Sequence, residues 1–135
     1  MPTPVLSPSD VLTLMHPKRN RSRGVDNSEQ GKQNRTYGGR LYHSLAEMRY
    51  AQMLDMRKRA GDIEDWWPQQ SIPLRVNGVL VCKMIADFKI LTVSREIEYA
   101  EVKGHMTDVF RLKLKLLRAC YPSVKYTIIP SKEVR

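Results

Sequence analysis

Two neighbouring segments of the chain carry the side chains best suited to chemistry. Asp87 stands inside a β-rich run from 79 to 91, and Glu101 and Lys103 follow in the strand-like segment 96–103. Side chains alternate between the two faces of a strand, so Glu101 and Lys103 share one face, with Cα atoms about 7 Å apart. Asp87 and Glu101 can meet where the two strands are adjacent. Two carboxylates beside an ammonium predict a divalent-metal site that hydrolyses phosphodiesters.

The donor set indicates which metal the site would hold. Mg²⁺ prefers oxygen ligands and is usually bound by one or two carboxylates together with water and substrate phosphate. We therefore expect Mg²⁺, or Mn²⁺ in its place, bound by Asp87, Glu101 and the backbone carbonyl of Val102. The Val102 side chain should point to the opposite, packed face, which leaves Glu101 and Lys103 free. Lys103 is expected to stabilise charge and position the attacking water, and a general-base role stays open.

The surroundings of these residues decide between a site and a surface ion pair. An exposed ion pair is the commonest role of Glu-x-Lys on a strand. Asp87, however, interrupts an otherwise apolar run, where an unpaired buried charge would be costly. Gly104 follows Lys103 directly, as expected where a strand opens into a loop. The context therefore favours the metal site.

The flanking residues predict a helix, hairpin strands, a third strand, a second helix and a last strand. Ser44 and Glu47 have the capping-box spacing of a helix start, and Gly61 ends that helix. Asn77-Gly78 is a strong two-residue hairpin turn. The expected elements cover residues 44–60, 63–67 with 69–76, 79–91, 96–103, 108–121 and 124–129. The apolar stripe of the second helix is expected at Val109, Leu112, Leu116 and Ala119.

Charge and composition indicate which classes of partner the chain can have. The 135-residue chain has a formal net charge of +9 and a sequence pI of about 9.8, which favours a polyanionic partner, most commonly nucleic acid. No apolar run is long enough for a membrane span, and no apolar helix carries the basic residues on one face, so we expect no membrane partner. The N-terminus lacks the pattern of a secretory signal, and Cys82 and Cys120 have no metal-type spacing. These features predict a cytoplasmic protein with two buried thiols.

The N-terminal region differs in composition from the rest. Residues 1–36 are poor in core-forming side chains and rich in Pro, Ser, Asn and Gln. They predict a disordered basic arm (1–36) ahead of one folded domain (37–135), and the arm either contacts a nucleic-acid backbone or is only a solvated tail. The side chains expected to contact DNA phosphates are Arg35, Arg40, Lys89, Arg111, Lys113 and Lys115, with plain solvation as the alternative.

The motifs together resemble the PD-(D/E)XK nuclease superfamily. The segments that carry the resemblance are Tyr42-His43-Ser44-Leu45-Ala46-Glu47, Ala86-Asp87-Phe88, Glu98-Tyr99-Ala100-Glu101-Val102-Lys103-Gly104 and Arg111-Leu112-Lys113-Leu114-Lys115. More closely, their order is similar to a small nuclease family of phages and prophages, often recorded only as a domain of unknown function. The resemblance covers about residues 37 to 130. Ala86 stands where the superfamily pattern has proline, a change that removes no ligand.

The resemblance implies a fold and a set of site residues. The fold is an α/β restriction-endonuclease-like core, α-β-β-β-α-β, with a mixed central sheet flanked by helices. The implied catalytic positions are Glu47, Asp87, Glu101 and Lys103. Glu47 has a competing explanation, because a glutamate at this place in a capping box can simply satisfy a backbone N–H. His43 and His105 flank the motifs and are interpreted as bystanders.

The sequence thus predicts a Mg²⁺-dependent DNA endonuclease guided by DNA structure or by a partner, with junction resolution as one form. A phage origin would place it in the cytoplasm of the bacterial host. Cutting both strands of a duplex requires two active sites, so a homodimer is compatible with this hypothesis. The alternative is a non-catalytic basic DNA-binding protein whose acidic cluster is structural. The intact set of Asp87, Glu101 and Lys103 favours the nuclease, because a binding protein has no need for three costly groups on one face.

Overall fold

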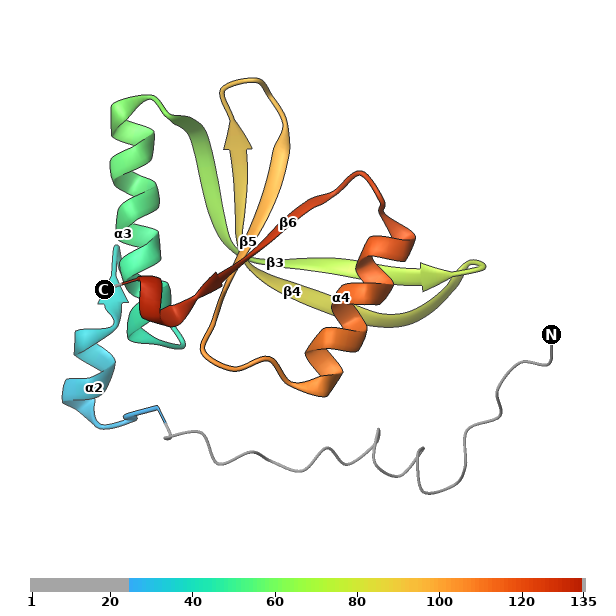
Figure 1. Cartoon of the computed structure of the whole chain (residues 1–135). Helices are drawn as coiled ribbons and strands as arrows, with labels where there is room; N and C mark the ends of the chain where they lie inside the picture. Colours follow the sequence, from blue (N-terminus) through green and yellow to red (C-terminus); the bar gives the residue numbers. More distant parts are fainter. Residues whose placement is uncertain (1–24, 135) are drawn as a thin grey trace.

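A mixed sheet with helices on its two sides forms the centre of the fold (Figure 1). The computed structural model describes residues 25–134. Its elements are α2 (Glu29–Asn34), β1 (Thr36–Tyr37), β2 (Arg40–Leu41), α3 (Leu45–Ala60), β3 (Ile63–Val76), β4 (Val79–Thr92), β5 (Ile97–Lys103), α4 (Asp108–Cys120), β6 (Lys125–Pro130) and a 3₁₀ turn, η1 (Ser131–Glu133).

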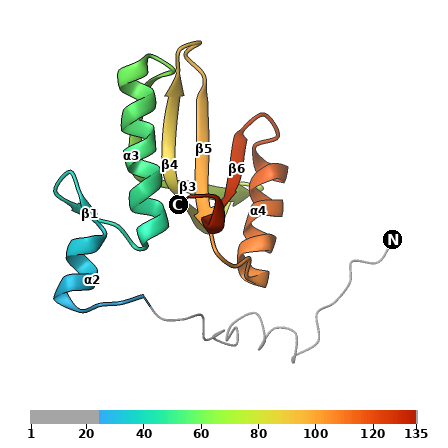
Figure 2. The ribbon, with the colours of Figure 1, turned by 60° about the vertical axis from the view of Figure 1, so that its left-hand side comes forward.

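The main sheet has four strands in the order β3-β4-β5-β6. The β3–β4 and β4–β5 pairs are antiparallel. β5 and β6 run parallel and are connected through α4. Figure 2 shows α3 and α4 on opposite sides of the sheet. The predicted α-β-β-β-α-β order and mixed sheet are confirmed from α3 to β6, and they are compatible with a restriction-endonuclease-like core.

Local sequence explains where α3 begins and ends. The Ser44 hydroxyl accepts a hydrogen bond from the Glu47 amide at 3.1 Å, which satisfies one of the amides that a helix start leaves unpaired. Gly61 follows the helix with φ of 81°, in the left-handed region that glycine adopts readily. The predicted helix start and stop are therefore confirmed, and they put Glu47 in the first turn.

β3 and β4 form one long antiparallel hairpin. Asn77 and Gly78 have φ of 49° and 79°, the pair of positive values typical of a type I′ turn, so the predicted turn is confirmed. β3 is an edge strand, which tolerates the missing N–H of Pro73. The sequence predicted two separate segments here, whereas the structure has a single strand over Ile63–Val76.

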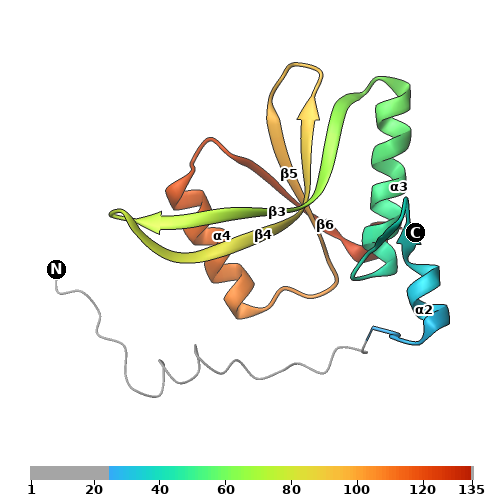
Figure 3. The same ribbon diagram turned by 180° about the vertical axis from the view of Figure 1, so that it is seen from behind.

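The hairpin bends in its middle, next to the expected site. Pairing continues on both sides of Gln69 and Asp87, but these two residues do not pair with each other. Gln69 has φ of 52°, a value that residues other than glycine rarely adopt. Figures 1 and 3 show the two halves of the hairpin running in different directions, one beside α3 and the other beside α4.

Two hydrophobic clusters fill the two sides of the sheet. The α3 cluster is centred on the fully buried Phe88, whose ring contacts those of Tyr42, Tyr50 and Trp66. The α4 cluster joins buried residues of the bent hairpin half to the helix and to β6, namely Ile72, Leu74, Met84, Ala86, Phe110, Leu114, Leu117 and Tyr126. Asp87 and Glu101, which belong to the sheet, therefore lie between the α3 cluster and the α4 cluster.

The buried face of α4 differs from the prediction. Phe110, Leu114 and Leu117 pack on the sheet. Of the expected stripe, Leu116 is partly buried against the same cluster, whereas Leu112 is 54% exposed. Both sets recur at helical spacing, so periodicity alone did not choose between them. Docking on the bent hairpin chose the set with the phenylalanine. Among residues 25–134, no helix is long and apolar enough to cross a membrane.

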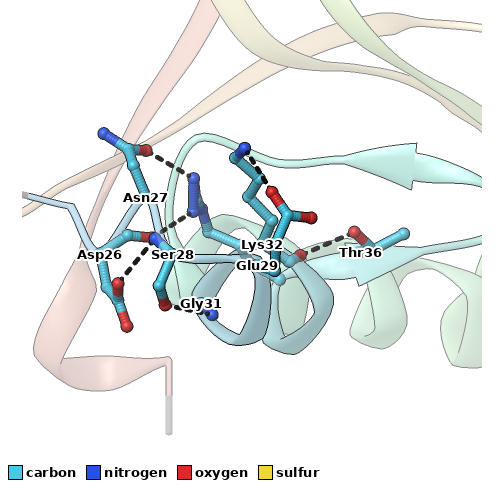
Figure 4. Close-up of polar contacts among 8 residues, drawn as sticks. Asp26, Asn27, Ser28, Glu29, Gly31, Lys32 and Thr36 are labelled. Atoms are coloured by element: carbon cyan, nitrogen blue, oxygen red, sulfur yellow. Dashed lines mark hydrogen bonds and ion pairs between the residues drawn. The ribbon is translucent and has the colours of Figure 1, made fainter.

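Residues 25–36 belong to the fold, which differs from the boundary predicted at residue 36. The Ser28 hydroxyl accepts from the Gly31 amide at the start of α2, and the Asp26 carboxylate accepts from the Ser28 amide (Figure 4). Lys32 is held by Glu29 at 3.0 Å, and its backbone carbonyl accepts from the Thr36 hydroxyl (Figure 4). Hydrogen bonds between polar residues stabilise this stretch, so its composition is as polar as that of a disordered arm. Residues 1–24 of the predicted arm lie outside the described residues.

Candidate active site

Asp87 is placed against β5 by the bend in the hairpin. The last pair of the β4–β5 ladder is Phe88 with Ala100, so Asp87 and Glu101 occupy the next positions on the two strands. Asp87 is 8% exposed, and its Oδ2 accepts a hydrogen bond from the Val102 amide at 2.9 Å. The carboxylate thus takes the place of a backbone partner for β5. This arrangement brings Asp87 to the same part of the sheet as Glu101.

Glu101 is more enclosed than the sequence predicted. It is 5% exposed, with Lys103 Nζ 3.0 Å from its Oε1 and the Tyr126 hydroxyl donating to its Oε2. The face expected to be free is partly covered, because Tyr126 of β6 contacts Glu101 and Phe110 of α4 lies against Lys103. The predicted packing of Val102 on the other face is confirmed, since it joins the α3 cluster.

Lys103 reaches the edge of this enclosed region. Its side chain is 28% exposed, and its ammonium lies 4.3 Å from the centre of the Phe110 ring. A carboxylate on one side and a ring face on the other both attract an ammonium. Lys103 is therefore held beside Glu101 while part of it contacts solvent.

Glu47 adds a third carboxyl group from the first turn of α3. It is 7% exposed, and its Oε2 has no hydrogen-bond partner within residues 25–134. Burial raises the pKa of Glu47 to about 7, with repulsion from Asp87 and Glu101 adding to the rise and the His43 amide and Lys103 opposing it. The helix-start contacts of Glu47 thus involve the Ser44 hydroxyl, which accepts from the Glu47 amide, and the His43 amide, which interacts with the carboxylate. These contacts leave Oε2 without a hydrogen-bond partner within residues 25–134.

Asp87 responds to the same surroundings. Burial raises the pKa of Asp87 to about 6, and the Glu101 charge raises it further, while the Val102 amide and Lys103 act in the opposite direction. Glu47, Asp87 and Glu101 thus share one nearby ammonium, that of Lys103. An excess of buried negative charge is unfavourable unless a cation neutralises it.

The residues present fit a hard divalent cation. Carboxylate oxygens are the ligands that Mg²⁺ and Mn²⁺ prefer, and Glu47 Oε2 is a buried oxygen without a donor. The N–H and C=O of a residue in an antiparallel strand face the same neighbour, so the Val102 carbonyl faces the side of Asp87, to which its amide donates. No three His, Cys, Asp or Glu side chains within residues 25–134 form a preformed metal cage.

A groove of about 340 Å³ opens beside Lys103. Its wall includes Gly104, His105, Ser131 and Lys132, from the loop after β5 and from η1. A Cβ on Gly104 would lie 3.2 Å from Ser131 Oγ, so glycine allows the two loops to approach closely. The groove is lined by the basic side chains of Lys103 and Lys132, and Lys103 also contacts the enclosed Glu101.

The predicted phosphate contacts fall into two groups. Arg40 on β2 and Arg111 and Lys115 on α4 are exposed, as that role requires. Lys89 on β4 is half-buried over the Trp67 ring, with Nζ 5.4 Å from the ring centre, and Lys113 Nζ donates to the Lys83 carbonyl at 3.3 Å.

Arg35 does not fit the predicted role. It is 7% exposed, and its guanidinium donates to the Tyr42 carbonyl at 3.2 Å, the Asp26 carbonyl at 3.1 Å and Asn27 Oδ1 at 3.0 Å. A phosphate would have to displace these acceptors. Arg35 is therefore a structural residue that joins α2 to the loop before α3.

Sequence reasoning missed two contacts at the site. Tyr126 donates to Glu101 across the parallel β5–β6 pair, and no sequence signal gives that register. His43, interpreted as a bystander, has its Nδ1 3.9 Å from Glu47 Oε2, with its side chain 77% exposed. The His43–Glu47 contact had a signal, since residues four apart face each other on a helix turn.

Comparison with known proteins places the chain in one family. A family model described as "Protein of unknown function (DUF1064)" matches residues 28–134. The chain belongs to this family. The match includes α2 and Arg35, in agreement with the folded start seen in the structure. Neither the curated proteins nor the solved structures contain a match to the chain.

Proposed function

We propose that the chain is a Mg²⁺- or Mn²⁺-dependent deoxyribonuclease of the PD-(D/E)XK superfamily. The observation that carries this proposal is the convergence of Glu47, Asp87 and Glu101 in a buried place with only Lys103 as a nearby ammonium. The unpartnered Glu47 Oε2 adds to it, because a purely structural cluster would be expected to satisfy its buried oxygens.

The carboxylates would hold the cation from three elements of the fold. Asp87 and Glu101, with the Val102 carbonyl, supply ligands from neighbouring strands, and Glu47 supplies an oxygen or orients a bound water from α3. When bound, the cation would polarise the scissile phosphate and lower the pKa of water. The packed layers on both sides keep the Asp87 and Glu101 side chains in place.

Lys103 would act on the phosphate and on the attacking water. Its ammonium is held between Glu101 and the Phe110 ring, at the edge of the carboxylate cluster, and this fixed position suits electrostatic stabilisation of the phosphate. Its partly exposed ammonium beside the groove can reach a strand that lies there.

DNA suits the remainder of the surface. The net charge of +9 attracts a polyanion, and Arg40, Arg111 and Lys115 are exposed cations outside the carboxylate cluster. Residues 25–134 form one α/β domain around the carboxylate cluster, and we propose cutting guided by DNA structure or by a partner. A homodimer would supply the two sites that a double-strand cut requires.

The decisive assay incubates the protein with supercoiled, linear, single-stranded and branched DNA in Mg²⁺, Mn²⁺ or EDTA. Cleavage is expected with either metal and none in EDTA. Lys103→Met should reduce cleavage by roughly 100-fold or more, because the transition-state charge loses a positioned cation.

A second ion pair that involves β5 supplies a matched control for Lys103→Met. Glu98 and Lys125 form an ion pair of 2.9 Å between β5 and β6, away from the carboxylate cluster. Lys125→Met removes an equivalent charge and should leave the turnover rate nearly unchanged. If the wild-type protein binds all four DNA forms but cuts none with either metal, the DNA-binding alternative replaces the nuclease.

A further inference from the structure

Tyr126 is a buried polar residue that the catalytic set does not include. It lies on β6 in register with Tyr99 of β5, is 7% exposed, and packs in the α4 cluster. Its hydroxyl donates to Oε2 of Glu101. The contact therefore joins the outermost parallel strand to a proposed metal ligand.

The direction of this hydrogen bond is set by both partners. An ionised carboxylate only accepts hydrogen bonds, so the phenol must donate. The geometry agrees, since the Tyr126 hydroxyl donates to Glu101 Oε2 across the β5–β6 pair.

Two donors hold the Glu101 carboxylate, one from its own strand β5 and one from the neighbouring strand β6. Lys103 contacts Oε1 at 3.0 Å, and Tyr126 donates to Oε2. The terminal torsion of a glutamate is otherwise broad, so a single contact would leave the carboxylate free to rotate. A carboxylate has about four lone-pair sites, and both oxygens therefore keep capacity for a cation.

We propose that Tyr126 is a positioning residue that fixes the Glu101 carboxylate in the orientation that binds the divalent cation. This inference rests on the proposed metal site. Ligands of metal sites are commonly oriented by such a hydrogen bond, whose loss weakens metal binding by roughly 10- to 100-fold. Tyr126 would act through Glu101 and would touch neither metal nor DNA.

The test compares Tyr126→Phe with Tyr99→Phe. Each variant loses one phenol hydroxyl and keeps its ring, and the two rings stack on each other with centres 6.3 Å apart. Mn²⁺ binding is measured by calorimetry without DNA. Tyr126→Phe should weaken Mn²⁺ binding by about 10-fold, whereas Tyr99→Phe should change it less than about 2-fold.

Cleavage supplies a second reading of the same effect. The Mg²⁺ concentration for half-maximal rate should rise by about 10-fold in Tyr126→Phe, while the rate at saturating Mg²⁺ stays within about 3-fold of wild type. A residue needed only for packing would lower thermal stability in both metal-free and metal-bound protein and leave the Mg²⁺ dependence unchanged.

The outcomes separate this inference from the proposed function. Equal Mn²⁺ affinity in wild type and Tyr126→Phe would overturn the positioning role and leave the metal site standing. Absence of Mn²⁺ binding in the wild-type protein would overturn both. Loss of a cooperative melting transition in Tyr126→Phe would show that the hydroxyl is structural, which also overturns the positioning role.

Discussion

Two regions of the molecule bury charge, and they do so in opposite ways. At Arg35, one guanidinium faces three oxygen acceptors of the chain itself, all within 3.2 Å. In the carboxylate cluster, Glu47, Asp87 and Glu101 face one ammonium, and Glu47 Oε2 has no donor among the described residues. The first region is complete without any ligand. The second has unfavourable charge that a cation would relieve.

The difference shows how to distinguish a structural charge from a functional one. Both regions are buried to a similar degree, with Arg35 and Glu47 each 7% exposed. Burial alone therefore does not identify a site. The balance of donors and acceptors does, because buried groups in a finished structure are almost always satisfied.

The largest expected effect separates the two regions by activity. Asp87→Asn should reduce DNA cleavage by about 1000-fold, or about 4 kcal/mol in the barrier, because the cation loses a charged ligand. Initial rates on the preferred DNA form in Mg²⁺ measure the loss. Glu98→Gln, which alters an ion-paired carboxylate elsewhere on the sheet, is the control and should stay near wild type. Similar losses in both variants would remove the distinction between cluster and surface.

The next largest effect is on stability and concerns Arg35 and its three acceptors. Arg35→Met should cost about 2–3 kcal/mol of unfolding free energy, because three acceptors lose their donor in a buried place. Urea denaturation measures this change. The cleavage rate per folded molecule should be unaffected.

A truncation sharpens the same point. A chain that begins at residue 37 should be less stable than one that begins at residue 25, since the first lacks Arg35 and its acceptors Asp26 and Asn27. Equal stability of these two chains would mean that the N-terminal contacts contribute nothing to the fold.

The carboxylate cluster should lower the free energy of unfolding as pH rises. Burial raises the pKa of Asp87 to about 6 and that of Glu47 to about 7, from ordinary values of 3.8 and 4.5. Between about pH 4 and pH 7 the folded state then binds more protons than the unfolded state, so stability falls across this window and levels off above it. Urea midpoints from pH 4 to pH 8 should follow this course in metal-free buffer.

Glu47→Gln isolates one part of that dependence. The variant should gain about 1–2 kcal/mol over wild type at pH 8 relative to pH 4, because it removes a buried negative charge beside two other carboxylates. Mn²⁺ should raise the wild-type melting temperature at pH 8 by neutralising the same charges. An unchanged pH profile in Glu47→Gln would show that its carboxylate is not strained by its neighbours.

The smallest effect concerns the surface around the cluster. Lys89→Gln should lower the slope of log affinity against log salt by about 0.9 for duplex DNA, the value of one phosphate contact. Filter binding in Ca²⁺ over a series of salt concentrations measures the slope. Lys125→Gln is the control, since Glu98 already pairs with Lys125. A slope unchanged by Lys89→Gln would assign that lysine to its contact with Trp67 alone.

Local features of the fold followed from the sequence. The Ser44 cap, the Gly61 stop and the Asn77-Gly78 turn were all predicted and all confirmed, because each depends on residues within a few positions of each other. The proximity of Asp87 and Glu101 also followed, since a short turn forces the two strands to be neighbours. The sequence by itself thus determined the bounds of α3, the hairpin turn and the proximity of Asp87 to Glu101.

Other features were decided only when the chain packed. Docking on a bent hairpin chose the buried face of α4, and hydrogen bonds across α2 made Arg35 structural instead of a phosphate contact. The parallel pairing of β6 brought Tyr126 to Glu101, 25 residues away in the chain. Whether a charge is satisfied depends on donors and acceptors from distant elements, and only the tertiary structure brings these together.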